Sequence, residues 1–339
     1  MTGPTTPRRR TTITDVAEAA GVAASTVSRA FTNPARVNHV TREHVLATAA
    51  RLGYAPNPAA QALESGRTNT LGLLVPDITN PYFAGVIKGA ERAADAAGYT
   101  LVLGDTQENP GREEQLLARL GRAVDGFVVA ASRLPDETLR RAAELNPLVL
   151  LNRAAAGLAC VVADFDTGTQ QIVAHLASHG HRSFVFLGGP AESWSGARRW
   201  NGLQTAARQQ GLEAQRFGPY TPTRASGAAA ADAVVGARAS AVVAHNDMLA
   251  IGVLARLAQR GVLVPDDVSV VGFDDIFGAD FCHPPLTTLA EPTEDAGARA
   301  VEALVLQARS PGSGEAPVRV LATQLVVRGS SGPLRPTAG

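Results

Sequence analysis

From residue 71 onward, short apolar runs alternate with longer segments in which apolar and polar positions recur at helical spacing. The apolar runs lie at 71–75, 100–104, 126–130, 147–151, 160–163, 184–188, 241–244 and 269–272. The helical segments between them include 83–97, 113–120, 168–178, 199–210 and 249–260. Buried strands alternating with helices predict parallel sheets that carry helices on both faces. Such units fit either one barrel or two doubly wound lobes, and the pattern alone leaves both open.

The head, residues 1–70, has a different pattern that predicts three short helices. Thr12 stands three residues before Asp15, which is a variant of the capping box, so a helix is expected to begin there and to end at Gly21. The segment 24–31 repeats the helical spacing, and Asn38 can cap a third helix. Two helices joined by a tight glycine turn form a helix-turn-helix, whose second helix fits the DNA major groove.

Charge is distributed unevenly, although the 339 residues carry 31 basic and 31 acidic side chains. Residues 1–70 hold eight arginines against four carboxylates, a net charge of +4. The remaining residues, the body, hold 23 basic and 27 acidic side chains, a net charge of −4. A basic head on a slightly acidic body indicates that the head meets a polyanion such as nucleic acid.

The composition argues against several classes of protein. No apolar run approaches the ~18 residues of a membrane span, and no secretory signal is visible, so the expected location is the cytoplasm. Cys160 and Cys282 are too few for a disulfide framework. The one lysine, Lys88, lies outside any phosphate-binding loop motif. The sequence has no Gly-x-Ser-x-Gly motif of a hydrolase and no Gly-x-Gly-x-x-Gly motif of a dinucleotide-binding protein after a strand. We therefore expect no catalytic residues and no cofactor.

Three histidines are the strongest candidates for a metal site. His175 and His179 are four residues apart and could share a helix face, with His181 just beyond. Gly180 is expected to end the helix and turn His181 away, and no carboxylate or cysteine lies close by in sequence to complete a zinc site. We expect no metal.

Ordered motifs without gaps run through the head: Asp15-Val16-Ala17-Glu18-Ala19-Ala20-Gly21-Val22, Thr26-Val27-Ser28-Arg29, Val37, Thr41-Arg42-Glu43 and Leu52-Gly53-Tyr54-Ala55-Pro56-Asn57. These motifs closely resemble the head of the lactose/galactose repressor (LacI/GalR) family. The resemblance places the family's base-reading positions on Ala24, Ser25 and Arg29, and a guanidinium such as that of Arg29 can bind both O6 and N7 of guanine. The alternative for Arg29 is a phosphate contact.

The resemblance also implies further contacts to DNA. The remaining expected DNA-binding residues are Thr12, Thr26, Ser28, Asn38, Tyr54, Asn57 and Leu63. Thr26, Ser28 and Asn38 correspond to residues that hold phosphates and set the register on the duplex. The chain departs from the family at Ala23, where relatives usually have a serine that caps the recognition helix, and losing that cap costs ~1 kcal/mol.

Residues 57–68 are expected to form a hinge. The segment is short, rich in alanine and interrupted by Pro58, so a helix there would not be stable alone. In the family that this chain resembles, the hinge helix folds only on operator DNA and wedges a leucine into the minor groove, a position that Leu63 occupies. The alternative for Leu63 is that it packs on the body. Arg8 to Arg10 of the basic arm are expected to lie near DNA phosphates, and the alternative is that the arm is a solvated tail.

Polar side chains follow many of the apolar runs of the body. They are Asp77, Asn80, Asp105, Asn152, Asp164, Asp166, Asn246, Asp247, Asp274 and Asp275. Ligands of open α/β sheets bind beyond the carboxyl ends of the strands, where these side chains would collect. Carboxylates and amides suit the hydroxyl groups of a neutral polyol.

Further motifs in the body are 76–83, 180–182, 188–190, 197–202, 245–248, 272–275 and 284–288. They resemble the effector domain of the same family, which is similar to periplasmic sugar-binding proteins, and the resemblance extends to about residue 329. It implies that Arg199, Asn246 and Asp274 hold the effector, with Asn80, Phe83, Asn152 and Trp194 lining the cleft. Arg199 could instead form a surface ion pair, and Trp194 could only brace a loop. The chain departs from the family at Asn152, where relatives often have aspartate, and at Glu291, where they usually have glutamine or arginine.

The expected fold is thus an all-α helix-turn-helix head followed by two doubly wound parallel-sheet lobes of the periplasmic-binding-protein type. The expected segments are a flexible basic arm (1–11), a helix-turn-helix domain (12–56), a hinge (57–68), an effector-binding and dimerisation domain (69–329) and a disordered tail (330–339). Within the effector domain, the N-lobe would take about 69–164 and 292–323, and the C-lobe about 165–291 and 324–329. The tail lacks the leucine heptads that would build a tetramer, so a homodimer is expected.

The sequence therefore predicts a transcriptional repressor that binds a pseudo-palindromic DNA operator as a homodimer and responds to a small-molecule effector, a sugar. A sugar-capturing receptor without a DNA-binding role is the alternative, and a sugar-processing enzyme comes third. Neither alternative gives the basic head a purpose.

Overall fold

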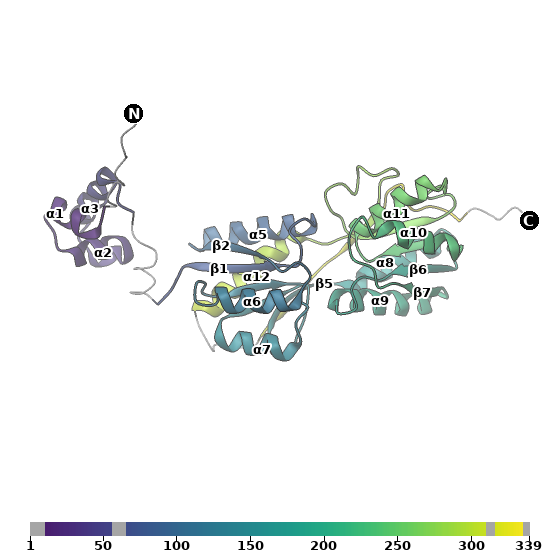
Figure 1. Cartoon of the computed structure of the whole chain (residues 1–339), viewed down its shortest axis with the longest axis horizontal. Coiled ribbons are helices and arrows are strands. Elements are labelled where there is room, and N and C mark those ends of the chain that lie inside the picture. Colours follow the sequence, from purple (N-terminus) through teal and green to yellow (C-terminus); the bar gives the residue numbers. More distant parts are fainter. Residues whose placement is uncertain (1–10, 56–65, 310–315, 335–339) are drawn as a thin grey trace, which may run out of the picture. The chain divides into compact units, whose positions relative to one another are not determined.

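The computed structural model describes residues 11–55, 66–309 and 316–334. The chain divides into two compact units, Met1–Asn69 (the head) and Thr70–Gly339 (the body). Figure 1 labels their helices and strands. None of the helices in the described ranges combines the length and apolar character needed to cross a membrane.

The head contains the predicted helices. Their bounds are α1 Ile13–Ala20, α2 Ala24–Thr32 and α3 His39–Leu52, with a short 3-10 turn at Pro34–Arg36. The predicted capping box is present, because the Asp15 amide donates to Thr12 Oγ1 (3.3 Å) and the Thr12 amide donates to Asp15 Oδ2 (2.7 Å). Gly21 ends α1 with φ +65°, a left-handed conformation that glycine adopts at little cost.

The core of the head is a small apolar cluster at which the three helices meet. Val16, Val27 and Val45 contribute one completely buried side chain from each helix. Phe31 and Tyr54 pack against this cluster with their rings edge to face, 5.9 Å between centroids. The apolar side of α2 is thereby fixed to the head, and its opposite side faces outward.

The N-lobe of the body is a sheet with the strand order β11-β5-β4-β3-β1-β2, all neighbours being parallel. Its strands are β1 Thr70–Val75, β2 Thr100–Asp105, β3 Phe127–Ala130, β4 Leu148–Leu151, β5 Ala159–Ala163 and β11 Val318–Leu321. Its helices are α5 Tyr82–Ala96, α6 Pro110–Leu120, α7 Asp136–Leu145 and α12 Thr293–Arg309. Helices α5 and α12 cover one face and α6 and α7 the other, so the central strands are buried on both sides (Figure 1).

The C-lobe repeats this architecture with the strand order β12-β10-β9-β8-β6-β7. Its strands are β6 Ser183–Leu187, β7 Glu213–Phe217, β8 Ala241–Ala244, β9 Ser269–Asp274, β10 Thr287–Ala290 and β12 Gln324–Val326. Its helices are α8 Phe165–Ser178, α9 Trp194–Gln210, α10 Gly227–Gly236 and α11 Asp247–Gln259. Strand β12 pairs antiparallel with β10, which is an exception to the predicted all-parallel arrangement.

The fold class predicted from the sequence is confirmed: a helical head precedes two parallel-sheet lobes. The two sheets are open and separate, so the single barrel is excluded. Strands β7, β10, β11 and β12 were absent from the apolar runs of the sequence, and of these only β10 is largely buried.

Glycines allow α5 and α12 to pack with their backbones in close contact. A Cβ atom on Gly89 would lie 1.9 Å from the Glu294 carbonyl oxygen, and one on Gly297 would lie 2.1 Å from the Val86 carbonyl oxygen. No side chain fits into these spaces. The contact fixes the start of α12, and therefore Glu291 just before it, against the N-lobe.

The chain crosses between the lobes three times within the described residues, after β5, after β10 and after β11. Two crossings are tied together, because the Asp164 amide donates to the Leu321 carbonyl (2.8 Å) and Thr323 Oγ1 donates to the Asp164 carbonyl (2.9 Å). The carboxyl ends of the strands of both lobes lie near these crossings.

The start of the predicted disordered tail is ordered. Ser330 is completely buried, with its hydroxyl donating to the Val270 carbonyl (2.6 Å). The Leu334 amide donates to the His179 carbonyl (2.9 Å). The sequence prediction fails over Ser330–Leu334 because polar groups of the C-lobe, rather than apolar contacts, hold this segment. Residues 335–339 lie outside the described residues.

Candidate functional site

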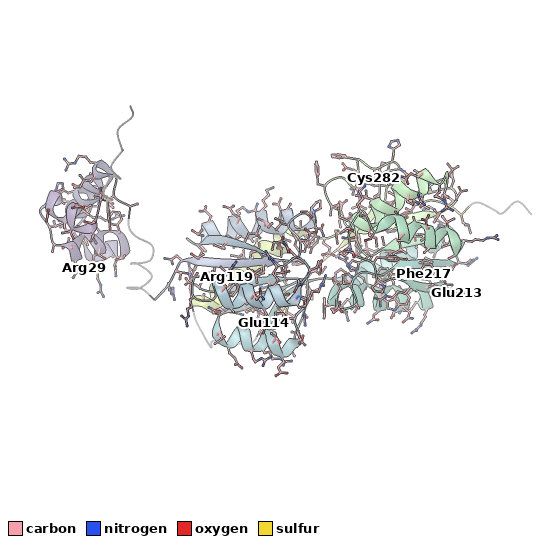
Figure 2. All side chains as sticks on the ribbon, in the orientation of Figure 1. Arg29, Glu114, Arg119, Glu213, Phe217 and Cys282 are labelled. Atoms are coloured by element: carbon pink, nitrogen blue, oxygen red, sulfur yellow. The ribbon has the colours of Figure 1, made fainter. Side chains whose placement is uncertain are left out.

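The outward side of α2 carries the side chains that the sequence assigns to base reading. Ala24, Ser25 and Arg29 are exposed, whereas Val27 and Ala30 of the same helix are buried. Among the described residues, none pairs with the Arg29 guanidinium, whose side chain extends from the head in Figure 2. The helix thus presents one long cationic donor beside small residues, and such a surface is suited to contact base edges in the major groove.

Other predicted DNA-binding residues also have structural roles in the head. Thr12 caps α1, and Asn38 caps α3 by accepting the Val40 amide (3.0 Å). Tyr54 packs on Phe31, and burial raises the pKa of its hydroxyl. Thr26 and Ser28 are half-buried on α2. Asn57 and Leu63 lie outside the described residues, as does the basic arm up to residue 10.

Helix α2 begins without a side-chain cap, as the sequence predicts. Ala23 occupies the N-cap position and makes no side-chain hydrogen bond. The first amides of α2 are therefore left without a side-chain acceptor, and a phosphate oxygen is a suitable acceptor for them.

One cleft of the body collects most of the residues predicted to bind the effector. Six of the seven line it: Asn80, Phe83, Asn152, Arg199, Asn246 and Asp274. The other lining residues are Pro76, Tyr82, Glu108, Ala131, Arg133, Ser195, Pro222 and His245. Both lobes contribute, and the volume is about 370 Å³, including the part open to solvent.

Trp194 does not line this cleft. Its ring is half-buried at the start of α9 and packs against the apolar clusters of both lobes. This packing favours the alternative in which Trp194 braces a loop, and its contact with the effector stays a prediction. A large ring that contacts two apolar clusters is held between them by the burial of its surface.

Three strand-end residues of the cleft have backbone conformations that are unusual for residues other than glycine. Ala131 follows β3 with φ +46°, Asn152 follows β4 with φ +54°, and Asp274 ends β9 with φ +107°. Such conformations cost free energy and are concentrated at functional sites. Here they turn the chain at the carboxyl end of each strand, where the side chains reach the cleft.

Arg199 is the most extensively bonded side chain of the cleft. Its Nη1 donates to the His245 carbonyl (2.5 Å), and its Nη2 donates to Asp274 Oδ1 (2.9 Å) and Glu291 Oε1 (2.8 Å). The guanidinium also lies over the rings of Phe165 and Phe273, 4.9 and 4.6 Å from their centroids. Burial alone would lower the pKa of Arg199, but the two carboxylates raise it. The surface ion pair considered from the sequence is thus a buried one.

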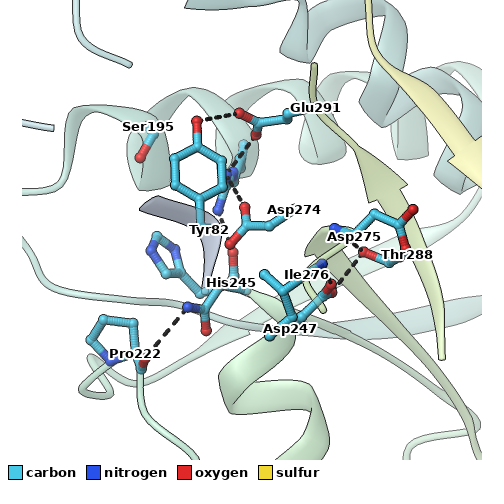
Figure 3. A network of polar contacts seen from close by, with 12 residues as sticks. Tyr82, Ser195, Pro222, His245, Asp247, Asp274, Asp275, Ile276, Thr288 and Glu291 are labelled. Carbon is cyan, nitrogen blue, oxygen red and sulfur yellow. Dashed lines mark hydrogen bonds and ion pairs between the residues drawn. The ribbon is translucent and has the colours of Figure 1, made fainter. Parts of the chain in front are cut away.

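The groups around Arg199 form one network, drawn in Figure 3. Desolvation raises the pKa of Asp274 well above its ordinary value; Arg199 opposes this shift, and the neighbouring carboxylates add to it. Tyr82 donates its hydroxyl to Glu291 Oε2 (2.9 Å). Burial, with the negative charge of Glu291, raises the pKa of Tyr82 well above its ordinary value, so it remains a donor.

Asp247 is a buried residue at the start of α11 that holds the segment carrying Asp274. Its carboxylate is completely buried and accepts the Thr288 hydroxyl (2.6 Å) and the Ile276 amide (3.0 Å). Desolvation raises the pKa of Asp247 to about 7. These bonds join the start of α11 to strand β10 and to the segment that follows β9, and so hold Asp274 in place.

Three buried polar atoms of the cleft have no hydrogen-bond partner in the described part of the chain. They are Asn152 Oδ1, His245 Nδ1 and Arg199 Nε, on residues that are 6, 5 and 2 % exposed. Burial lowers the pKa of His245 well below its ordinary value, and the charges of Arg199 and Arg133 add to this, so the ring is neutral. Buried polar groups normally have partners, and a bound ligand would supply them.

Sequence reasoning missed the pair of Arg133 and Glu108. Arg133 Nε and Nη2 both donate to Glu108 Oε2, at 2.9 and 2.8 Å, on the N-lobe side of the cleft. The signal was available, because Arg133 follows β3 and Glu108 follows β2 as the other polar residues follow their strands. Tyr82, Ser195 and His245 were likewise not assigned.

A buried carboxylate fixes the segment that carries Arg133. Glu113 accepts the Ser132 hydroxyl and the Arg133 amide (3.1 Å), and burial raises the pKa of Glu113. Arg153 donates to the Ser132 carbonyl (2.8 Å) and pairs with Asp136 (2.6 Å). The loop after β3 is therefore held by polar contacts on its buried side.

The histidines that the sequence singled out contact the ordered start of the tail. His175 Nε2 lies 2.7 Å from Ser331 Oγ, and the rings of His175 and His179 meet edge to face. His181 is buried, with its nitrogens near Ser240, Ser269 and the Gly332 carbonyl. Over the described residues, no group of histidines, cysteines and carboxylates is arranged to hold a metal ion.

The chain matches two family models. The model described as "Bacterial regulatory proteins, lacI family" matches residues 12–57, and the "Periplasmic binding protein-like domain" matches residues 173–331. The sequence is 32% identical to the HTH-type transcriptional repressor CytR of Escherichia coli (strain K12) over 330 residues, covering 94% of this chain and 96% of that protein.

Two solved structures show the same similarity at the level of the fold. The lac repressor dimer bound to operator and the anti-inducer ONPF has a TM-score of 0.85 at 25% identity, covering 96% of this chain and all of that one (100%). The complex of the transcriptional regulator CelR with cellobiose has a TM-score of 0.71 at 29% identity, covering 95% of this chain and 100% of that one.

Proposed function

The chain belongs to the LacI family of bacterial transcriptional regulators and is a DNA-binding repressor with an effector-binding domain, not an enzyme; from this premise, we propose that a small molecule bound in the cleft of the body controls how tightly the head binds operator DNA. The protein would act in the cytoplasm, where it meets the chromosome. A transport receptor, the alternative considered from the sequence, has no use for a head that matches the lacI family over residues 12–57.

The observation that carries this proposal is the set of unpartnered polar atoms on Asn152, His245 and Arg199. All three residues line one cleft that is built from both lobes. A ligand that bonds to them would contact the N-lobe through Asn152 and the C-lobe through His245 and Arg199, and would therefore favour one arrangement of the lobes.

We propose that the effector is a sugar or a molecule of similar size and polarity. Phe83 and Pro222 offer apolar surface to a ring, while Asn80, Asn152 and Asn246 offer amides to hydroxyl groups. The similar CelR structure is a complex with cellobiose. Binding of the effector in the cleft would typically change the free energy of operator binding by roughly 1–3 kcal/mol.

We propose that the protein binds a pseudo-palindromic operator as a homodimer. Phe277 and Phe281 expose 81 and 67 % of their surface, with rings 5.0 Å apart between centroids. Exposed apolar pairs of this kind mark interaction sites. Two copies would place two α2 helices on neighbouring major-groove half-sites, with Arg29 of each reading bases.

The test is a selection of genomic DNA fragments at low ionic strength with the full-length protein, followed by fluorescence anisotropy with the selected duplex. We expect tight sequence-specific binding that is lost when residues 1–56 are deleted. A panel of sugars, nucleosides and related metabolites is then screened for changes in operator affinity. Failure to select any duplex would contradict the proposal.

Asp274→Ala tests the place of the cleft in the response. Because Asp274 orients Arg199 within the cleft, this variant should lose the effector response while its effector-free operator affinity stays within about twofold of wild type. Asp95→Ala, at an exposed position on α5, is the matched control and should respond normally. A normal response in Asp274→Ala, with folding checked by circular dichroism, would move the effector site elsewhere.

A further inference from the structure

We propose that Glu291 is a specificity-determining residue that restricts the effector to molecules without a phosphate or carboxylate group. The inference rests on the proposed function, since it assumes that the cleft is the effector site. It concerns a residue that does not line the cleft itself and acts through Arg199.

The charge of Arg199 is already balanced within the protein. Its Nη2 donates to two carboxylates, Asp274 Oδ1 at 2.9 Å and Glu291 Oε1 at 2.8 Å. One carboxylate is enough to neutralise one guanidinium, so the two carboxylates on Nη2 leave Arg199 with no unbalanced positive charge. All three side chains are at most 5 % exposed, so water screens these charges weakly.

The second cation of the cleft is balanced as well. Arg133 Nε and Nη2 both donate to Glu108 Oε2 and form an ion pair with it. Among the described residues, the cleft is lined by two arginines, Arg133 and Arg199, and by no lysine. His245 also lines it, but its lowered pKa keeps the ring neutral. An anionic ligand would therefore enter without an uncompensated cation to receive it, and an unpaired buried charge is costly.

Glu291 cannot easily turn away to make room for an anion. Its second oxygen accepts the Tyr82 hydroxyl (2.9 Å) from the N-lobe, while its first accepts from Arg199 of the C-lobe. The residue precedes α12, whose glycine contact with α5 fixes this part of the chain. Figure 3 shows the hydrogen bond from the Tyr82 hydroxyl to Glu291, with Asp274 below it.

The groups left for a ligand suit a neutral molecule rich in donors. Asn152 Oδ1 is an unpartnered acceptor, and the carboxylate residues Glu108 and Asp274 also line the cleft. Arg199 Nε is the unpartnered donor, and His245 Nδ1 can take either role. A ring with several hydroxyl or amino groups satisfies this set, whereas a phosphate, which only accepts at its ionised oxygens, does not.

The experiment measures the affinity of the full-length protein for inorganic phosphate from thermal-shift titrations, with chloride replaced at constant ionic strength. Glu291→Gln removes one of the two carboxylates on Arg199 but keeps the size of the side chain. We expect its affinity for phosphate to rise about tenfold or more above wild type, because a repelling charge next to Arg199 is lost.

Tyr82→Phe is the second variant, because it keeps every charge and removes only the hydroxyl that holds Glu291. We expect a smaller gain in phosphate affinity from it. Glu291→Asp keeps the negative charge and should reject phosphate as wild type does, which separates charge from a general loosening of the cleft. Glu213→Gln removes a carboxylate at the exposed strand β7, away from the cleft, and should change nothing (Figure 2).

Phosphate that binds to the basic head contributes equally to every variant, so only differences between variants report on the cleft. Equal phosphate affinity in wild type, Glu291→Gln and Tyr82→Phe would overturn the inference. So would a gain in Glu291→Asp as large as that in Glu291→Gln. Operator binding that ignores every small molecule would instead overturn the proposed function and leave the phosphate result standing, so the two failures are distinguishable.

Discussion

At the scale of single residues, the head and the body use arginine in opposite ways. Arg29 is exposed and has no partner among the described residues, so its donors are free for a base edge. Arg199 is 2 % exposed and bonds to two carboxylates and a carbonyl. The first arginine can recognise an anionic polymer directly, whereas the second organises a site from which anions are excluded.

Arg29→Ala should weaken binding to the selected operator by about 1–3 kcal/mol and relax the preference at one base pair. The physical reason is the loss of the bidentate hydrogen bonds from Arg29 to O6 and N7 of guanine. Anisotropy with the operator and a repeat of the selection measure both effects. An equal loss of affinity for every sequence would make Arg29 a phosphate contact instead.

Asp247 should make stability depend on pH. Burial raises its pKa from the ordinary 3.8 to about 7, so between these values the folded chain holds a proton that the unfolded chain releases. Stability therefore falls as pH rises through this window, by at most about 1.4 kcal/mol per pH unit. Asp274 shifts in the same direction and adds to the slope.

Asp247→Asn should flatten part of that slope, because asparagine carries no titrating proton yet can still bond to Thr288 and the Ile276 amide. Denaturant unfolding between pH 4 and pH 7 measures it, with the exposed Asp95→Asn as the matched control. The same slope in both variants would show that Asp247 does not carry the dependence.

At the scale of elements, the contact between α5 and α12 depends on glycine. Gly89 lies where a Cβ atom would meet the Glu294 carbonyl at 1.9 Å, a backbone atom that cannot rotate aside. The two helices cover one face of the N-lobe sheet, and α5 carries Tyr82 while α12 follows Glu291. Packing at this contact therefore positions Tyr82 and Glu291, which bond to each other at the cleft.

Gly89→Ala should destabilise the body by about 1–3 kcal/mol or more, because the added methyl group forces the helices apart. Gly236→Ala is a matched control in helix α10, where a Cβ atom meets nothing within 4 Å. That variant should be neutral or stabilising by about 0.4–1 kcal/mol. The midpoint of thermal unfolding is measured for both variants. Similar midpoints for Gly89→Ala and Gly236→Ala would contradict the close contact between the helices.

At the scale of the whole molecule, the proposed homodimer depends on the exposed aromatic pair of the body. Replacing Phe277 and Phe281 together with serine should turn the dimer into a monomer, because the buried apolar area of the interface is lost. Sedimentation velocity measures the state, and operator affinity should fall with it because each monomer offers one α2.

Leu145→Ser provides the control for that experiment, since Leu145 is a single apolar side chain on α7 with 84 % of its surface exposed. It should leave the oligomeric state unchanged. A dimer that survives the loss of both phenylalanines would place the interface on another surface.

The order of elements and the class of fold could be predicted because they depend on local patterns. Thr12 and Gly21 fix the ends of α1 through their own side chain or backbone, and buried strands such as β8 are apolar throughout. The missed strands β7, β11 and β12 are short and partly exposed, so hydrogen bonding in the sheet, rather than a buried apolar run, defines them. The same reason explains the ordered Ser330, whose partners lie far away in the sequence.

The kinds of residue that line the cleft could be predicted from the sequence, because polar side chains that follow parallel strands meet at the carboxyl edge of the sheet. Which of them bond to one another could not be predicted. The pairs Tyr82 with Glu291 and Arg199 with Asp274 join positions 209 and 75 residues apart. Burial and the neighbouring charges together shift the pKa values of Tyr82, Arg199 and Asp274. The amino-acid sequence by itself determined the helical head, the two lobes and the family, since these follow from local periodicity and short motifs. Only the tertiary structure decided that Arg199 is neutralised, that Trp194 packs between the lobes and that Glu291 stands next to the site, because distance and desolvation exist only after the chain has folded.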